Sequence, residues 1–155
     1  MQALWADPHV TFAGKFHRIE DAGINPRPAK RSVPIWYGGH ADVTLRRVVK
    51  WGAGWMPLDY APGPEAAAAI AKLRGYAAAA GRDPASIGID TRVTVGIGTE
   101  NDWRETVRFW KSCGVSHLTL GTYSGRGHLR RISGRTLPDH LAAIRRYWNA
   151  VGDLL

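Results

Sequence analysis

The residues best suited to chemistry lie in one glycine-rich segment, Gly38-Gly39-His40. The segment separates a short buried-strand pattern at residues 34–37 from a helical pattern at residues 41–51. Glycines let a backbone approach a ligand closely, and the unpaired N–H groups of a first helical turn point toward that ligand. Together with the helix dipole, these groups suit a phosphate. The segment therefore predicts a phosphate-binding loop, while a tight turn without a ligand stays open as the alternative.

Arg92 is a second position that could hold an anion. Polar and apolar residues alternate over residues 88–97, which predicts a strand with Arg92 and Asp90 on its polar face. In a closed barrel this face points inward, toward a cofactor or an anionic substrate. An ion pair with Asp90 or another buried acid is the alternative.

Other polar residues follow the last expected strand, where barrel enzymes gather their active-site groups. Tyr123 and Ser124 come directly after that strand, and a glycine-containing loop comes next. The loop carries basic side chains that could meet an anionic cofactor tail or lie in solvent: Arg126, His128, Arg130 and Arg131. We expect His117 to be a packed core or helix-facing residue and Cys113 a buried small hydrophobe. These patterns name no catalytic residue.

The composition is that of a globular protein. Hydrophobic residues make up 45% and charged residues 22% of the 155 residues, which argues against disorder. No apolar stretch approaches the ~18 residues that span a membrane, and no secretory signal is visible at the N-terminus. The single cysteine has no internal disulfide partner, and no metal-ligand spacing surrounds it. We therefore expect no membrane partner, no metal site and a cytoplasmic location.

The net charge of +8 and the pI of about 10.1 raise the question of nucleic acid. A nucleic-acid-binding protein usually adds a recognisable module to its charge. The sequence has no zinc-finger spacing, no basic heptad helix and no aromatic RNA-binding motif. We expect no nucleic-acid partner, because an anionic small ligand explains part of the charge equally well.

From residue 34 onward, strand and helix patterns alternate. The expected strands are residues 34–37, 54–58, 88–97 and 115–121, and the expected helices are residues 41–51, 64–80, 102–113 and 136–151. Four βα units in a row predict an α/β fold with a parallel sheet and right-handed crossovers. Two closures fit: an open doubly wound sheet, or half of a TIM (β/α)8 barrel, which takes ~250 residues when complete.

The first 33 residues break this alternation. Residues 10–12 and 15–19 are expected to form a small hairpin, and an extended linker follows at residues 25–28. We expect residues 1–155 to form a single domain, with the hairpin and linker at 1–33 and four βα units of a half barrel at 34–155.

The last expected helix has the most regular apolar row. Its members recur at helical spacing: Leu137, Leu141, Ile144, Trp148 and Val151. We therefore expect Leu141 and Trp148 to be buried, and Arg145 and Arg146 to be exposed to solvent.

Several short motifs follow one another in a fixed order: Leu4-Trp5, residues 10–16, Pro26-Arg27-Pro28, residues 34–42, Leu45-Arg46-Arg47, residues 52–57 and Gly81-Arg82-Asp83-Pro84. The ordered set resembles the luciferase-like monooxygenase family, especially its deazaflavin-dependent branch. The resemblance covers residues 4–122 and, more faintly, the last helix. The sequence departs from the family at Ala53, where an acidic residue usually precedes the Gly-Trp pair, which puts local hydrogen bonding in doubt.

The resemblance implies a barrel whose fifth to eighth strands are those expected here. It implies that Gly38 and Gly39, with His40 adjacent, contact the phosphate of a deazaflavin (coenzyme F420) or of FMN. The implied chemistry is hydride transfer between a small organic substrate and the deazaflavin, or oxygen activation by reduced flavin. Because the family's N-terminal half is absent from this sequence, we expect the chain to be inactive as an oxidoreductase by itself.

Other interpretations stay open. The sheet could be completed by the missing N-terminal half, encoded upstream of Met1, or by a second copy in a homodimer. The chain could instead be a doubly wound nucleotide-binding domain with Gly38 and Gly39 in its first βα loop. It could also be a truncated half-barrel that associates with a partner and catalyses nothing.

Overall fold

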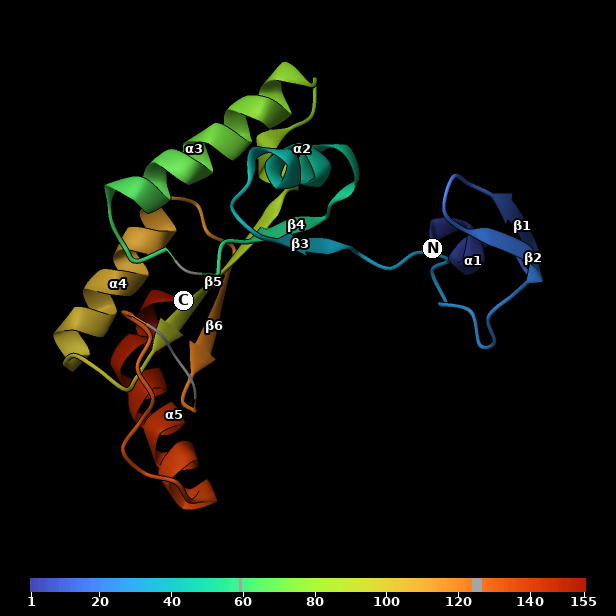
Figure 1. Ribbon diagram of the computed structural model, residues 1–155. Coiled ribbons are helices and arrows are strands. Elements are labelled where there is room, and N and C mark those ends of the chain that lie inside the picture. Colours follow the sequence, from blue (N-terminus) through green and yellow to red (C-terminus); the bar gives the residue numbers. More distant parts are fainter. Residues whose placement is uncertain (59, 124–126) are drawn as a thin grey trace. The chain divides into compact units, whose positions relative to one another are not determined.

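The computed structural model describes residues 1–58, 60–123 and 127–155, which fall into two units, Met1–Ile35 and Trp36–Leu155 (Figure 1). The first unit holds helix α1 (Gln2–Ala6) and an antiparallel hairpin of β1 (Val10–Ala13) and β2 (Arg18–Ala22). The Gly14 N–H donates to the His17 carbonyl at 2.8 Å. This bond closes the turn, so β2 begins later than residue 15. That both units form one domain stays a prediction.

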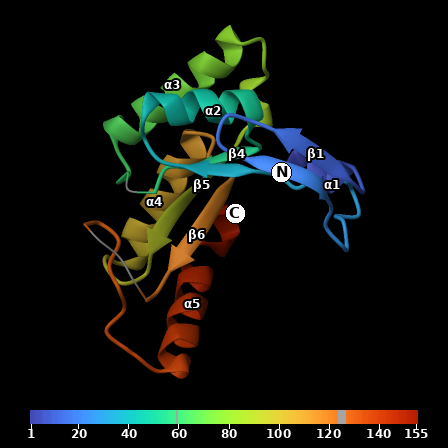
Figure 2. The ribbon, with the colours of Figure 1, turned by 45° about the vertical axis from the view of Figure 1, so that its right-hand side comes forward.

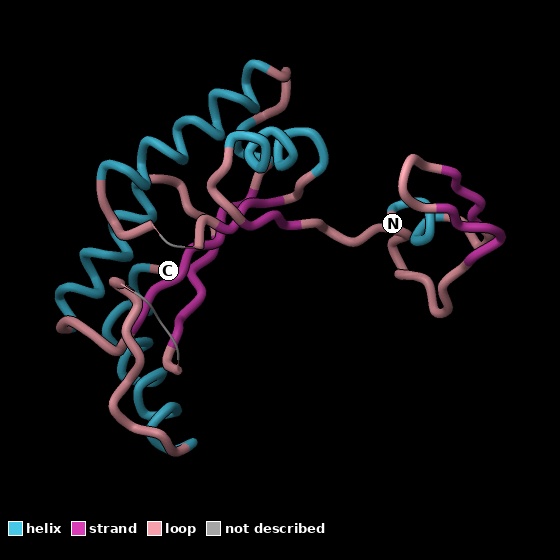
Figure 3. The backbone as a smooth tube through the Cα atoms, viewed as in Figure 1, coloured by secondary structure: helices cyan, strands magenta, loops and turns pink. Residues whose placement is uncertain are grey.

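The described residues of the second unit form a parallel four-stranded sheet in the order β3-β4-β5-β6 (Figure 3). The strands are Trp36–Gly38, Gly54–Met56, Gly88–Thr94 and His117–Gly121. The helices are α2 (Asp42–Trp51), α3 (Pro64–Ala79), α4 (Glu100–Ser112) and α5 (Leu137–Val151), with short 3-10 turns η1 (Pro84–Ser86) and η2 (Gly152–Leu154). The predicted α/β fold with parallel βα units is confirmed.

The order of the strands favours a barrel over a doubly wound sheet. Consecutive strands are neighbours throughout, without the reversal in strand order that defines a doubly wound sheet. Figure 2 shows α2 and α3 toward the β3 end of the sheet and α5 toward the β6 end. Buried residues of all these helices join one core cluster with the strand residues Trp55, Ile89 and Val93. A segment of a (β/α)8 barrel has this arrangement, with its helices outside and its other sheet face inside.

One tryptophan covers part of the face that is turned away from the helices, which we call the inner face. The Trp36 ring lies across two neighbouring strands, where a Cβ on Gly54 or Gly88 would come within 2.3 or 2.5 Å of its atoms. The ring then meets His117 edge-on, with ring centroids 5.1 Å apart. The prediction that His117 is a packed core or helix-facing residue is wrong. His117 is exposed on the inner face, because it alternates along β6 with the half-buried Leu118, which packs against the core.

The alternation expected for β5 holds over Gly88–Thr94, where Ile89, Thr91 and Val93 are buried. The strand ends at Thr94 and does not continue to residue 97, so Ile97 is exposed. The cause is a segment after β6 that crosses the end of β5. The Thr94 hydroxyl donates to the Arg130 carbonyl, and a Cβ on Gly96 would lie 2.1 Å from the same oxygen.

Helices α4 and α5 begin with reciprocal caps. The hydroxyls of Thr99 and Thr136 accept a hydrogen bond from the backbone N–H three residues later, and Asp102 and Asp139 bond back to the cap. Hydrogen bonds from the Thr99 backbone and hydroxyl lower the pKa of Asp102, and those from Thr136 lower the pKa of Asp139. The caps fix where both helices start.

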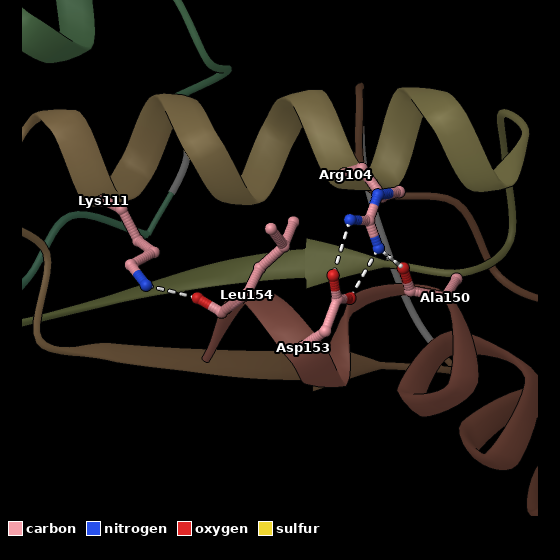
Figure 4. Close-up of polar contacts among 5 residues, drawn as sticks. All are labelled: Arg104, Lys111, Ala150, Asp153 and Leu154. Carbon is pink, nitrogen blue, oxygen red and sulfur yellow. Dashed lines mark hydrogen bonds and ion pairs between the residues drawn. The ribbon is translucent and has the colours of Figure 1, made fainter.

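The buried face of α5 differs from the predicted one. Trp148 is 61% exposed and Leu141 42% exposed, and Leu137 and Ile144 are also exposed. The buried residues are Tyr147, Ala150 and Val151, while Arg145 and Arg146 are exposed as expected. Polar contacts with α4 set this rotation: Arg104 donates to both carboxylate oxygens of Asp153 at 2.6 and 2.7 Å and to the Ala150 carbonyl (Figure 4).

Candidate cofactor-binding site

The glycine-rich loop joins the carboxyl end of β3 to the first turn of α2. Gly38 is the last residue of β3, and α2 begins at Asp42. Gly39 has a φ of 112°, a conformation that L side chains rarely adopt, so this position requires glycine. A Cβ on Gly38 would meet no atom closer than 3.8 Å. The loop therefore has the position expected from the sequence, at the strand ends where barrel ligands bind.

Trp55 of β4 holds this loop in place. Its indole Nε1–H donates to the Gly39 carbonyl at 2.8 Å, and its side chain is fully buried. Sequence reasoning missed this role. A tryptophan in a short apolar run looks like a core residue, and nothing local shows that its N–H reaches a loop one βα unit away.

The first turn of α2 leaves two backbone N–H groups, those of Asp42 and Val43, available to bind a ligand. Ala41 is the N-cap, and no side chain among the described residues caps this turn. The N–H groups of Thr44 and Leu45 are occupied by the Ala41 carbonyl, whereas the helix offers no internal acceptor to those of Asp42 and Val43. Free first-turn amides at the positive end of a helix dipole can bind an anion.

Asp42 is the acidic group next to these amides, and cations neutralise it. Lys72 of α3 lies 2.5 Å from its Oδ1, the Tyr76 hydroxyl donates to Oδ1 at 2.6 Å, and Arg46 Nε donates to Oδ2 at 3.2 Å. The hydrogen bond from Lys72 is the largest cause that lowers the pKa of Asp42 to about 2. The same bond raises the pKa of Lys72. Two cations surround one carboxylate, so the mouth of the loop does not repel an anion.

A cavity of about 380 Å³ lies beside the loop. Its lining comes from β4, from α2, from the loops after β3 and β4, and from one side of α3: Trp55, Leu45, His40, Tyr60, Glu65, Ala68, Ala69 and Lys72. The His40 and Tyr60 rings pack together there, with centroids 4.8 Å apart. The volume lies at the small end of the range for ligand pockets, so it suits part of a cofactor better than a whole one.

The structure separates Arg92 from this cavity. Arg92 lies on the inner face of β5, exposed and without an ion pair among the residues that are described. The alternative of a pair with Asp90 is not found, because Asp90 instead accepts hydrogen bonds from the Thr119 hydroxyl at 2.9 and 3.0 Å. Arg92 is thus free to meet a ligand or another chain segment on the inner face.

Of the polar residues that the sequence singled out after β6, the structure places only some at the same edge of the sheet as the glycine-rich loop. Because the strands are parallel, the ends of β3 and β6 lie at the same edge of the sheet, as predicted, and Tyr123 there is exposed. Ser124 and Arg126 lie outside the described residues. Arg130 and Arg131 are exposed, His128 is half-buried, and Cys113 is half-buried against the core.

A histidine that the sequence did not single out also lies at this edge. His140 in the first turn of α5 bonds through Nδ1 to the hydroxyl of the buried Thr122 at 2.8 Å. Within residues 1–58, 60–123 and 127–155, no cluster of three or more His, Cys, Asp or Glu side chains could hold a metal ion. No described helix has the length and apolarity needed to cross a membrane.

Comparison with known proteins places the chain in a family. A family model described as luciferase-like monooxygenase matches residues 1–155. No curated protein sequence matches the chain significantly.

Solved structures give the same indication for the fold. An F420-dependent secondary alcohol dehydrogenase, solved with an F420-acetone adduct, has a TM-score of 0.51 and 17% identity, covering 96% of this chain and 50% of its own. The monooxygenase RslO1 from Streptomyces bottropensis has a TM-score of 0.52 and 18% identity, covering 99% and 39%. The coenzyme F420 dependent tetrahydromethanopterin reductase from Methanopyrus kandleri has a TM-score of 0.52 and 15% identity, covering 96% and 52%. The chain thus spans about half or less of these structures.

Proposed function

Because the chain belongs to the luciferase-like monooxygenase family, we propose that it forms the C-terminal part of an oxidoreductase of that family that uses coenzyme F420 or FMN. Two of the similar structures are F420-dependent enzymes, which supports F420 as the first cofactor to test. We further propose that the substrate is a small organic molecule and that the protein works in the cytoplasm.

The observation that carries the proposal is the loop at Gly38 and Gly39. Gly39 in this loop has a positive φ, and Trp55 supports the loop through a hydrogen bond. The first turn of α2, which no described side chain caps, offers backbone N–H groups that suit the phosphate of either cofactor. We assign Gly38, Gly39 and His40 to hold that phosphate. Arg92, farther along the inner face, is assigned to a more distant anionic or carbonyl group of the cofactor.

The cofactor, when bound, would supply hydride transfer or oxygen activation. The residues of this chain bind and orient it: the loop amides hold the phosphate, and Lys72 and Arg46 keep Asp42 from repelling it. The described inner face leaves Arg92, His117 and Thr119 exposed to water. A hydride path needs a dry, aligned site, so we propose that the chain has no turnover until other segments cover this face.

Gly39 gives a direct test with a matched control. Gly39→Asp and Gly39→Asn both place a side chain of the same shape on a backbone that disfavours one, and they differ only in charge. We expect Gly39→Asp to bind F420 and FMN at least ~10-fold more weakly than Gly39→Asn, since a carboxylate repels a phosphate at close range. Titrations followed by flavin or deazaflavin fluorescence measure this. Equal affinities of the two variants would remove the loop from the site.

A further inference from the structure

The chain exposes apolar side chains at the two ends of its row of helices. The middle helices of the row are α3, which packs beside α2, and α4, which packs beside α5. Arg74 of α3 donates to the Cys113 carbonyl at the end of α4 at 2.7 Å, which joins the two helix pairs. Over the described residues, neither α3 nor α4 carries a large exposed hydrophobic side chain. The end helices do: Val43 and Trp51 on α2, and Leu137, Leu141, Ile144 and Trp148 on α5. Among the described helices α2 to α5, the large exposed hydrophobic side chains therefore lie only on the two end helices, where the next helix of a longer row would pack.

On α5, the exposed row lies away from α4. On the opposite side of the helix, Arg104 of α4 bonds to Asp153 and Ala150 (Figure 4). Arg146 also contacts α4 there, with its Nε 3.2 Å from Glu100 Oε1. Residues three and four positions apart are neighbours on a helix, so Arg145 lies beside both Leu141 and Trp148. We call Leu137, Leu141, Ile144, Arg145 and Trp148 the α5 end face.

On α2, the exposed row lies away from α3. Asp42 and Arg46 face α3, where they meet Lys72 and Tyr76. Val43, Arg47 and Trp51 recur every four residues on another side of the helix, and Lys50 lies 4.6 Å from the centre of the Trp51 ring. We call Val43, Arg47, Lys50 and Trp51 the α2 end face.

Both end faces carry positive charge that the chain leaves unpaired. In the described part of the chain, Arg47 and Arg145 have no ion pair and no side-chain hydrogen bond. When a partner covers an arginine, the guanidinium loses its hydrating water. Only a carboxylate or a similar acceptor on the partner compensates for this loss. Whatever covers these apolar rows must therefore bring acidic groups with it.

We propose that the two end faces dock on a polypeptide that completes the sheet, and that its contacting helices carry carboxylates beside an apolar row. The sheet supports this occupant, because β3 and β6 each have one neighbouring strand among the described residues and leave an unpaired edge. A second copy fits the apolar rows but not the charges. Closing two copies into a ring brings Arg145 of one beside Arg47 and Lys50 of the other, and each copy has a net charge of +8. The inference rests on the proposed function only in taking the completed sheet to be a barrel.

A pair of synthetic amphipathic helical peptides tests the charge preference. Both peptides carry a leucine row at helical spacing, and they differ only in having glutamates or lysines beside the row. We expect the purified chain to bind the glutamate peptide at least ~5-fold more tightly in calorimetric titrations, the size expected for one or two exposed charge pairs. Equal binding of the two peptides overturns the proposal.

Two double variants separate a local effect from net charge. Arg47→Glu with Arg145→Glu reverses the end faces, and we expect it to bind the lysine peptide more tightly. Arg31→Glu with Arg131→Glu makes the same change in net charge elsewhere on the exposed surface, and we expect it to keep the wild-type preference. Circular dichroism verifies the folding of both. If both double variants change preference equally, the selectivity comes from net charge and the proposal fails.

Sedimentation of the wild-type chain tests the alternative occupant. We expect a monomer at physiological salt, and a stable dimer that persists in Arg47→Glu and in Arg145→Glu would overturn the acidic partner in favour of a second copy. The proposed function is tested separately by the cofactor titration. A chain that prefers the glutamate peptide but binds neither cofactor would contradict the proposed function and leave the docking surface intact.

Discussion

Asp42 is the residue on which the charge at the candidate loop depends. Its carboxylate stands beside the free amides of α2, and its partners come from α2 itself and from α3. The spacing of Asp42 and Arg46 on one helix could be predicted from the sequence. The contacts with Lys72 and Tyr76 could not, because they depend on how two helices pack. The same holds for the bond from Trp55 to Gly39, so the sequence indicates the loop but not what supports it.

We expect Asp42→Asn to destabilise the chain at neutral pH but not in strong acid. The pKa of Asp42 is about 2 in the folded chain, against 3.8 ordinarily, so its contribution to stability is complete above pH 3.8 and disappears as the pH falls toward 2. Urea unfolding over this range measures the effect. Asp7→Asn is the control, because Asp7 has no ion pair among the described side chains. A difference between Asp42→Asn and wild type that is constant with pH would contradict the assignment.

Helix α5 shows what apolar periodicity alone does not predict. Its row of Leu137, Leu141, Ile144 and Trp148 is the most regular apolar pattern in the sequence, yet the buried row contains Tyr147 and Ala150. Periodicity reports that one side of a helix is apolar, and it does not distinguish packing within the chain from packing on a partner. The contacts of Arg104 with Asp153 that rotate α5 join different elements and leave no local pattern.

This rotation predicts very different losses of stability when two adjacent aromatic residues are replaced by alanine. Tyr147→Ala should cost ~3–5 kcal/mol, as for other buried aromatic residues, and Trp148→Ala should cost less than about 1 kcal/mol. Tyr147→Phe should be neutral or stabilising, because the Tyr147 hydroxyl is buried without a partner among the described residues and burial raises its pKa to about 12. Denaturant melts measure all three. A larger loss for Trp148→Ala than for Tyr147→Ala would show that α5 buries the row predicted from the sequence.

The larger unit, Trp36–Leu155, is a row of βα units in which helices cover one face of the sheet and the described inner face stays open. The order of the units and the alternation within β5 could be predicted, since both follow from local spacing. The choice between a barrel and a doubly wound sheet needed the observed strand order and the placement of the helices. Exposed polar side chains on the inner face and apolar rows at both ends indicate which surfaces the rest of a barrel would cover.

We propose that this chain carries part of a cofactor site and depends on other segments for catalysis. The most direct test is to purify residues 1–155 and assay hydride transfer and oxygen-dependent turnover with added F420 or reduced FMN over a panel of small alcohols, aldehydes and alkanes. Binding of the cofactor is followed in the same samples. We expect weak binding of the cofactor, which Gly39→Asp abolishes, and no turnover above that of free cofactor. Clear turnover by a monomer of the wild-type chain would show that residues 1–155 need no other segment for catalysis.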